Sequence, residues 1–307
     1  MIRRILALAP LATAGWLLAQ GAAAQGLPIP GFGNTGTALP VAIEADQGVE
    51  WRQNEQVYIA RGNATAKRGE TTIRADALYA HYRKTQDNRQ EIYKITAEGA
   101  VKITTPKETI TSDTAEYAVE TAVFTLKGRP VKIESGKSTL TAALVVYNSK
   151  SKVATVTGGA QVVEEKKRVR ADRFVAFFKE EGGKQSLKRV EALGNVIITT
   201  PTEIARGNRG DYDSETQMAT LSGNVRLTRG DNQLNGDRAE VNMKSGVSKL
   251  LAGEGPATAS RTNPAEGKRV RVLIMPGQAD SGKGPLDIPT PGAENKGTGR
   301  TDQKPKR

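Results

Sequence analysis

Five aspartates recur in one short phrase along the chain. The phrase has an aliphatic residue, two spacers of which the second is small, and then Asp, as in "IEADQGV" from Ile43 and "ITSDTAEYAV" from Ile110. Carboxylates in this number could ligate a metal ion or form a pair of catalytic acids. Steps of about 30 residues or more would instead spread them along a stack of repeated units, so we expect them to mark structural corners. The five are Asp46, Asp76, Asp113, Asp172 and Asp237.

The single histidine and the many glycines complete no catalytic or cofactor motif. His81 has no cysteine or second histidine to share a metal ion. A serine triad would need His81 as its base, and no GxSxG sequence accompanies it. No GxGxxG or Walker sequence lies between a strand and a helix, where its glycines would hold phosphates. We therefore expect no catalytic residue, no metal site and no cofactor.

The two ends of the chain differ in composition from its middle. Residues 1–24 have a basic start, an apolar centre and a small-residue end, which is typical of a cleaved secretory signal peptide; a retained anchor is the alternative. Residues 25–40 are rich in Gly and Pro and predict a flexible leader. Residues 276–307 contain almost no large apolar side chain and predict a disordered basic tail. One structured domain is expected over residues 41–275.

The chain is basic and contains no cysteine. Its net charge is +12, from 45 Lys+Arg against 33 Asp+Glu, and an exported chain without Cys cannot rely on disulfides or form a thiolate metal site. The run "KKRVRADR" from Lys166 to Arg173 reads best as a solvated strand face. Nucleic-acid binding is not expected, because aromatic residues for base stacking make up only 5% of the chain. Attraction to phosphorylated lipids or acidic glycans remains open.

A repeated glycine divides the middle of the chain into units. Glycines that open an alternating strand pattern recur at Gly62, Gly99, Gly128, Gly158, Gly194, Gly223 and Gly253, in steps of 29 to 37 residues. Glycine within a strand commonly marks a bulge or bend, so long strands should bend at these positions. Each unit then turns at a polar cluster and returns through the aspartate phrase. Seven units of two strands predict an all-β, antiparallel architecture of about 14–16 strands, built from ~30-residue repeats.

Around each glycine the apolar residues fall at every second position. This alternation places them on one face of a strand, with charged and hydroxyl residues on the other. The apolar face is dominated by small aliphatic side chains, which predicts either a filled core or an open groove for acyl chains. The candidate lipid-binding residues are Val101, Ile103, Ile110, Tyr117, Val196, Ile198, Val225, Leu227, Leu234 and Val241.

With its signal, its repeated phrase and strands such as "LSGNVRLTRGDNQLNGDRAEVNMKSGVSKL" (221–250), the chain resembles the OstA/LptA family over residues 41–275. The resemblance implies a curved, open-ended antiparallel β-jellyroll and a periplasmic lipopolysaccharide carrier or bridge, without enzymatic activity. Its apolar interior would shield the acyl chains of lipid A while the sugars stay outside.

The resemblance also implies partners that pair with exposed edge strands. These would be the inner-membrane-anchored and outer-membrane lipopolysaccharide-transport proteins, together with further copies of the chain joined head to tail. One candidate edge is residues 41–49 and the other is residues 269–276. Their apolar residues are Ile43, Val49, Val270, Val272 and Ile274.

Two other functions remain open on the residues alone. One is a non-catalytic envelope β-solenoid scaffold with a filled core, which binds acidic glycans through a basic face. The other is a glycan-processing enzyme on a β-helix, which would require two converging carboxylates.

Overall fold

The computed structural model divides the chain into two units, residues 1–274 and residues 275–307. The residues that it describes all belong to the first unit, and the predicted signal, leader and tail lie outside them. Among the described residues there is no helix, and hence no helical segment that could cross a membrane. The described ranges are 41–181, 184–242, 244–245, 247–252 and 271–273.

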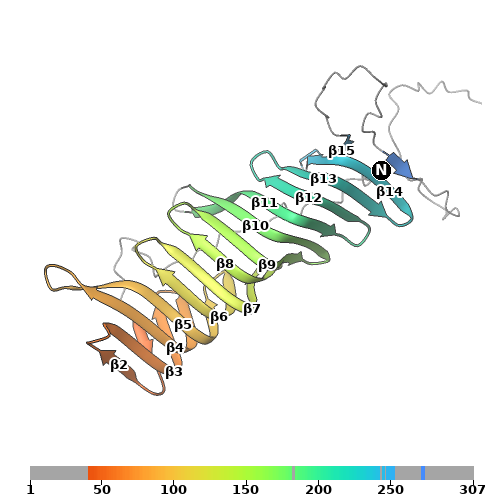
Figure 1. Cartoon of the computed structure of the whole chain (residues 1–307). Coiled ribbons are helices and arrows are strands. Elements are labelled where there is room, and N and C mark those ends of the chain that lie inside the picture. The colour runs from red at the N-terminus through yellow and green to blue at the C-terminus, as the bar shows by residue number, and fades with distance from the viewer. Residues whose placement is uncertain (1–40, 182–183, 243, 246, 253–270, 274–307) are drawn as a thin grey trace, which may run out of the picture. The chain divides into compact units, whose positions relative to one another are not determined.

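Sixteen strands form one antiparallel sheet in the described part of the chain, and β3 to β14 follow one another in chain order (Figure 1). The predicted all-β class and strand number are confirmed. The strands are β1 (Ala42–Glu44), β2 (Val49–Arg52), β3 (Val57–Arg68), β4 (Thr71–Lys84), β5 (Gln90–Thr104), β6 (Glu108–Ala118), β7 (Val123–Ser135), β8 (Ser138–Asn148), β9 (Val153–Glu164), β10 (Lys167–Glu181), β11 (Lys184–Thr199), β12 (Ile204–Asp213), β13 (Met218–Arg229), β14 (Asn232–Asn242), β15 (Val247–Leu251) and β16 (Arg271–Leu273).

Alternation along each strand separates an inner from an outer face. In β5, Val101 and Ile103 are buried, whereas Lys102 between them is exposed. No helix or second sheet among the described residues covers the inner face. Inner side chains such as Ile103, with 0% exposure, must therefore be covered by other parts of the same sheet. The sheet supplies both sides of its own core, as a sheet folded along a line of bends would do.

The bends lie at a bulge that recurs at the repeated glycine. In the β11–β12 pair, Gly194 and Asn195 together oppose the single residue Asn208, and both have positive φ, 75° and 46°. Glycine adopts such φ values without cost and asparagine tolerates them. The same two-against-one register shift occurs in the β3–β4, β5–β6 and β13–β14 pairs. The glycine bulge predicted from the sequence is therefore present.

The aspartates of the repeated phrase lie beside these bulges. A Cβ added to Gly99 would come within 2.1 Å of Asp76 Oδ2, and one added to Gly194 within 2.3 Å of Asp172 Oδ2. The Asn195 amide donates to Asp172 Oδ2 at 2.8 Å. The donor here is the side chain of the residue that follows the glycine. The aspartate of each of these phrases thus lies in close contact with the glycine bulge of the following strand.

Two short strands share each end of the sheet. β1 and β2 both pair with β3, on either side of the turn at residues 45–48, and β15 and β16 both pair with β14. The predicted edge at residues 41–49 is present, but it is interrupted. At the other end β15, which the sequence did not single out, shares the edge with β16.

Candidate functional site

The ten candidate lipid-binding residues lie in the described sheet, and most are covered. Val101, Ile103, Ile110, Val196, Ile198, Val225 and Val241 have exposures of 8% or less. Tyr117, Leu227 and Leu234 are half-buried. All except Leu234 belong to or pack against one core cluster. Along most of the sheet, the inner face is therefore filled by its own side chains.

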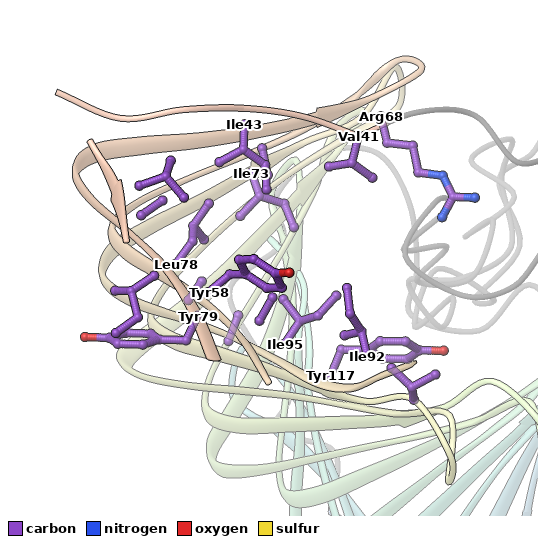
Figure 2. A pocket seen from close by; sticks show the side chains of 18 of the residues that line it. Val41, Ile43, Tyr58, Arg68, Ile73, Leu78, Tyr79, Ile92, Ile95 and Tyr117 are labelled. Carbon is purple, nitrogen blue, oxygen red and sulfur yellow. The ribbon is translucent and has the colours of Figure 1, made fainter. Parts of the chain in front are cut away.

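A cavity of about 420 Å³ remains at the β1 end of the inner face. Its lining is mostly apolar and comes from β1 to β7; it includes Ile43, Ile73, Leu78 and Ile95, together with the charged residues Arg68 and Glu91. Figure 2 shows these side chains between Arg68 at one margin and Tyr117 at the other. This volume falls within the ~300–1,000 Å³ typical of small-molecule sites. Of the ten candidates, Tyr117 alone lines this cavity.

Aromatic residues form one cross-strand row on the inner face, here called the aromatic row. Cross-strand partners run from Trp51 and Tyr58 through Ala80 and Ile95 to Tyr117, and then to Phe124 and Tyr147. Farther along the sheet the row continues through Ala154, Ala176, Val190, Tyr212, Ala219 and Val241. These residues are distant in sequence, and only the strand register brings them into line.

The opposite ends of the same inner face carry a polar row. Each member lies two positions beyond an inward aliphatic residue, at or next to the end of one strand from β3 to β14. In the first half the members are Arg68, Thr71, Thr105, Glu108, Ser135 and Ser138. In the second half they are Glu164, Lys167, Thr200, Glu203, Arg229 and Asn232.

Glu108 differs from the other acids of the polar row. It is only 6% exposed, and its Oε2 is one of two buried side-chain atoms in the described residues without a hydrogen-bond partner. Burial raises the pKa of Glu108 to about 7, although the nearby charge of Lys107 lowers it in part. Burial also raises the pKa of Glu203, but there Arg229 lies 3.8 Å away. The other orphan atom is Ser112 Oγ, also on the inner face of β6.

The residues first considered for catalysis do not converge. The five phrase aspartates lie in the turn after β1 and on four separate strands, and the described residues contain no cluster of acids and histidines suited to a metal ion. The His81 ring lies 6.1 Å from that of Tyr93, and burial lowers the pKa of its imidazole. Within the basic run, Lys167 joins the polar row, whereas Arg168 and Arg170 are exposed on the outer face.

Cations gather on the outer face behind the polar row. Arg74 directly opposes Lys102, and Arg206 directly opposes Arg226. Like charges at opposing positions are unfavourable, so such pairs favour an anion between or above them. Lys132 and Arg170 lie in the same cross-strand row; Lys132 forms an ion pair with Glu134 at 2.6 Å.

The candidate edge residues have different outcomes. Ile43 and Val49 are 46% and 55% exposed and also line the cavity. Val272 lies on β16, opposite Leu234, while Val270 and Ile274 lie outside the described residues. Val247 and Leu251 of β15, which the sequence did not single out, are 51% and 39% exposed. Six of the eight large exposed apolar residues of the described chain thus lie on or beside the end strands β1, β2 and β15, and the other two lie on β5.

Sequence reasoning also missed the aromatic and polar rows. A signal for the polar row was present in "TTPKET" and "TTPTE", where a threonine hydroxyl accepts the backbone N–H of the following glutamate, at 3.0 Å for both Glu108 and Glu203. The aromatic row has no comparable local signal.

Comparison with known proteins places the chain near one family. A family model described as "LptA/(LptD N-terminal domain) LPS transport protein" matches residues 42–153 and 141–247. Among solved structures, LptH from Pseudomonas aeruginosa, described as the LptA homologous periplasmic component of the lipopolysaccharide transport device, aligns at 11% identity. The alignment covers 78% of this chain and 96% of that one, with a TM-score of 0.18. No curated protein matches the sequence.

Proposed function

Because the chain belongs to the LptA/LptD N-terminal family of lipopolysaccharide transport proteins, we propose that it carries lipopolysaccharide with the lipid A acyl chains against the inner face. The observation that carries this proposal is the mostly apolar cavity of about 420 Å³, whose lining includes the inner-face residues Ile73, Leu78 and Ile95. Each acyl CH₂ buried there would contribute about 0.8 kcal/mol. Such binding needs no catalytic residue, and we propose no enzymatic activity.

The ten candidate lining residues remain part of this proposal. An acyl chain would first enter the cavity, at Tyr117. It would reach the buried candidate residues only when the two sides of the inner face move apart. Small aliphatic side chains such as Val101 and Val196 suit this separation, because they interlock less deeply than large ones. The acyl chain would then replace the contacts that the two sides make with each other.

A photo-crosslinker placed in cells tests the proposal. At Ile95, which lines the cavity, and at Leu227 we expect capture of lipopolysaccharide, since both residues lie on the inner face. At their outward neighbours Thr96 and Arg226 we expect less than about a tenth of that yield. Equal capture at the inner and outer positions would refute the proposal that the acyl chains bind on the inner face.

One observation favours a second function, a scaffold that binds acidic glycans on its outer face. The inner face is largely filled, and the outer face presents the like-charged pairs Arg74–Lys102 and Arg206–Arg226. In that case the crosslinker at Arg226 would capture a delipidated glycan as well as whole lipopolysaccharide. The position at Ile95 would capture neither.

We further propose that the chain works in the periplasm, exported by a cleaved signal peptide, and that its end strands pair with other transport proteins and with copies of itself. Exposed edge strands are templates for strand addition, and apolar exposure at both ends supports this use.

Charge placed on the β15 edge should weaken this association. Val247→Lys together with Leu251→Lys is expected to raise the self-association Kd at least about tenfold, because edge lysines oppose strand pairing. Light scattering after size-exclusion chromatography measures the change. Tyr93→Lys removes a similarly exposed apolar side chain away from the two edges and should leave association intact. If both variants weaken association equally, general surface charge is responsible.

A further inference from the structure

The inner face is amphiphilic across its width. Every strand from β3 to β14 contributes a polar side chain at or next to one end, whereas the aromatic row near the other ends is apolar, with only tyrosine hydroxyls and an indole N–H as polar groups. The apolar core lies between the two rows. Such an arrangement matches a ligand that is itself polar at one end and apolar at the other.

Glu108 is the member of the polar row whose environment is least complete. Its cross-strand partner is Ser135, and it faces Thr105 across the turn, yet its Oε2 is buried and has no hydrogen-bond partner. Leaving a buried acceptor unsatisfied costs stability. By contrast, Glu203 has Arg229 at 3.8 Å, and Glu164 lies opposite Lys167.

The chemistry of the row defines what would complete it. Buried carboxylate and hydroxyl groups accept hydrogen bonds from O–H donors. The positive charges of Arg68 and Lys167 attract a phosphate group. Arg68 also lines the cavity, so the polar row and the apolar cavity meet at the β1 end of the sheet (Figure 2). A phosphorylated, hydroxyl-rich headgroup attached to acyl chains satisfies both parts. A fatty acid or a hydrocarbon satisfies only the apolar part.

We propose that the polar row is the headgroup subsite of the groove: sugar hydroxyls of a phosphorylated glycolipid donate to Glu108, and the acyl chains extend from there towards the aromatic row. This inference rests on the proposed function and deepens it, because it assigns one margin of the inner face to the sugar and the other to the chain ends. Glu108 is then a ligand-binding residue, and its hydrogen-bond donor is a hydroxyl group of the bound glycolipid.

Two probes separate the headgroup from the chains. Diphosphorylated lipid A carries both parts, and a fluorescent fatty acid carries no sugar or phosphate. Glu108→Leu in the full chain is expected to weaken lipid A binding about tenfold and to change fatty-acid binding less than twofold, since a hydrogen bond to a charged group is lost. Glu134→Leu, an acid of β7 on the outer face, should change neither. Thermal unfolding checks that the variants fold, and Glu108→Gln, which keeps the shape of the side chain, should give a smaller loss in the same direction.

The outcomes are distinct from those of the general proposal. If Glu108→Leu and Glu108→Gln leave lipid A binding unchanged, or weaken both probes equally, the headgroup subsite is wrong. If the unaltered chain binds neither probe, the proposed carrier function itself fails.

Discussion

Glu108→Gln is expected to raise the free energy of unfolding at pH 8 by up to about 3 kcal/mol and to leave it nearly unchanged at pH 4. The expectation follows from the raised pKa of Glu108, about 7 against an ordinary value of 4.5, which arises from burial. Below pH 4.5 the carboxyl is protonated in both the folded and the unfolded chain. Between pH 4.5 and 7 the unfolded chain releases the proton and the folded chain retains it, so stability falls; above pH 7 the full penalty is present.

Urea unfolding at pH 4, 6 and 8 measures this effect. Other acids also titrate, since burial raises the pKa values of Glu164 and Glu203 as well, but their contributions cancel when Glu108→Gln is compared with the unaltered chain. Glu134→Gln provides the control on the outer face of the neighbouring strand. A stability difference between Glu108→Gln and the unaltered chain that is the same at all three pH values would contradict the assignment.

Gly99→Ala is the second change with a large expected effect, a loss of about 3 kcal/mol in the free energy of unfolding. The residue has φ of 75°, which costs alanine of order 1 kcal/mol, and its Cβ would lie 2.1 Å from Asp76 Oδ2. Gly136→Ala is the matched control. Gly136 also has positive φ, 56°, but a Cβ there would meet nothing within 4 Å.

Chemical denaturation separates the two costs. Gly136→Ala should lose only about 1 kcal/mol, and Asp76→Ala introduced together with Gly99→Ala should recover most of the difference between the two glycine sites. If the two single glycine variants lose equal stability, the close approach of the aspartate to the bulge contributes nothing.

The sheet and its bulges could be predicted because their signals are local. Alternation around Gly99 or Gly194 specifies a strand and its buried face, and a glycine within that pattern specifies a bend. Spacing alone could not predict which glycine each aspartate of the repeated phrase contacts. Asp76 follows Gly62 by 14 residues, but it packs on Gly99, because the register between neighbouring strands decides the contact.

The candidate site was harder to predict for the same reason. Tyr58, Tyr117 and Tyr147 become neighbours along one row only after six strands have paired. The cavity depends on where the inner face lacks covering side chains, and alternation cannot show this: it marks Val101 and Tyr117 as equally inward, yet only Tyr117 lines the cavity. Glu108 likewise reads as an ordinary turn glutamate until its burial is known.

The two-strand unit makes the length of the protein adjustable. Each hairpin adds about 10 Å to the width of the sheet. It brings its own bulge, an aspartate or the residue that replaces it, and one residue per strand for the aromatic row and for the polar row. A gene that gained or lost one whole hairpin would therefore keep the cross-section of the inner face, and only the distance from one end strand to the other would change. Loss of a single strand would reverse the direction of all the strands that follow and exchange the two margins.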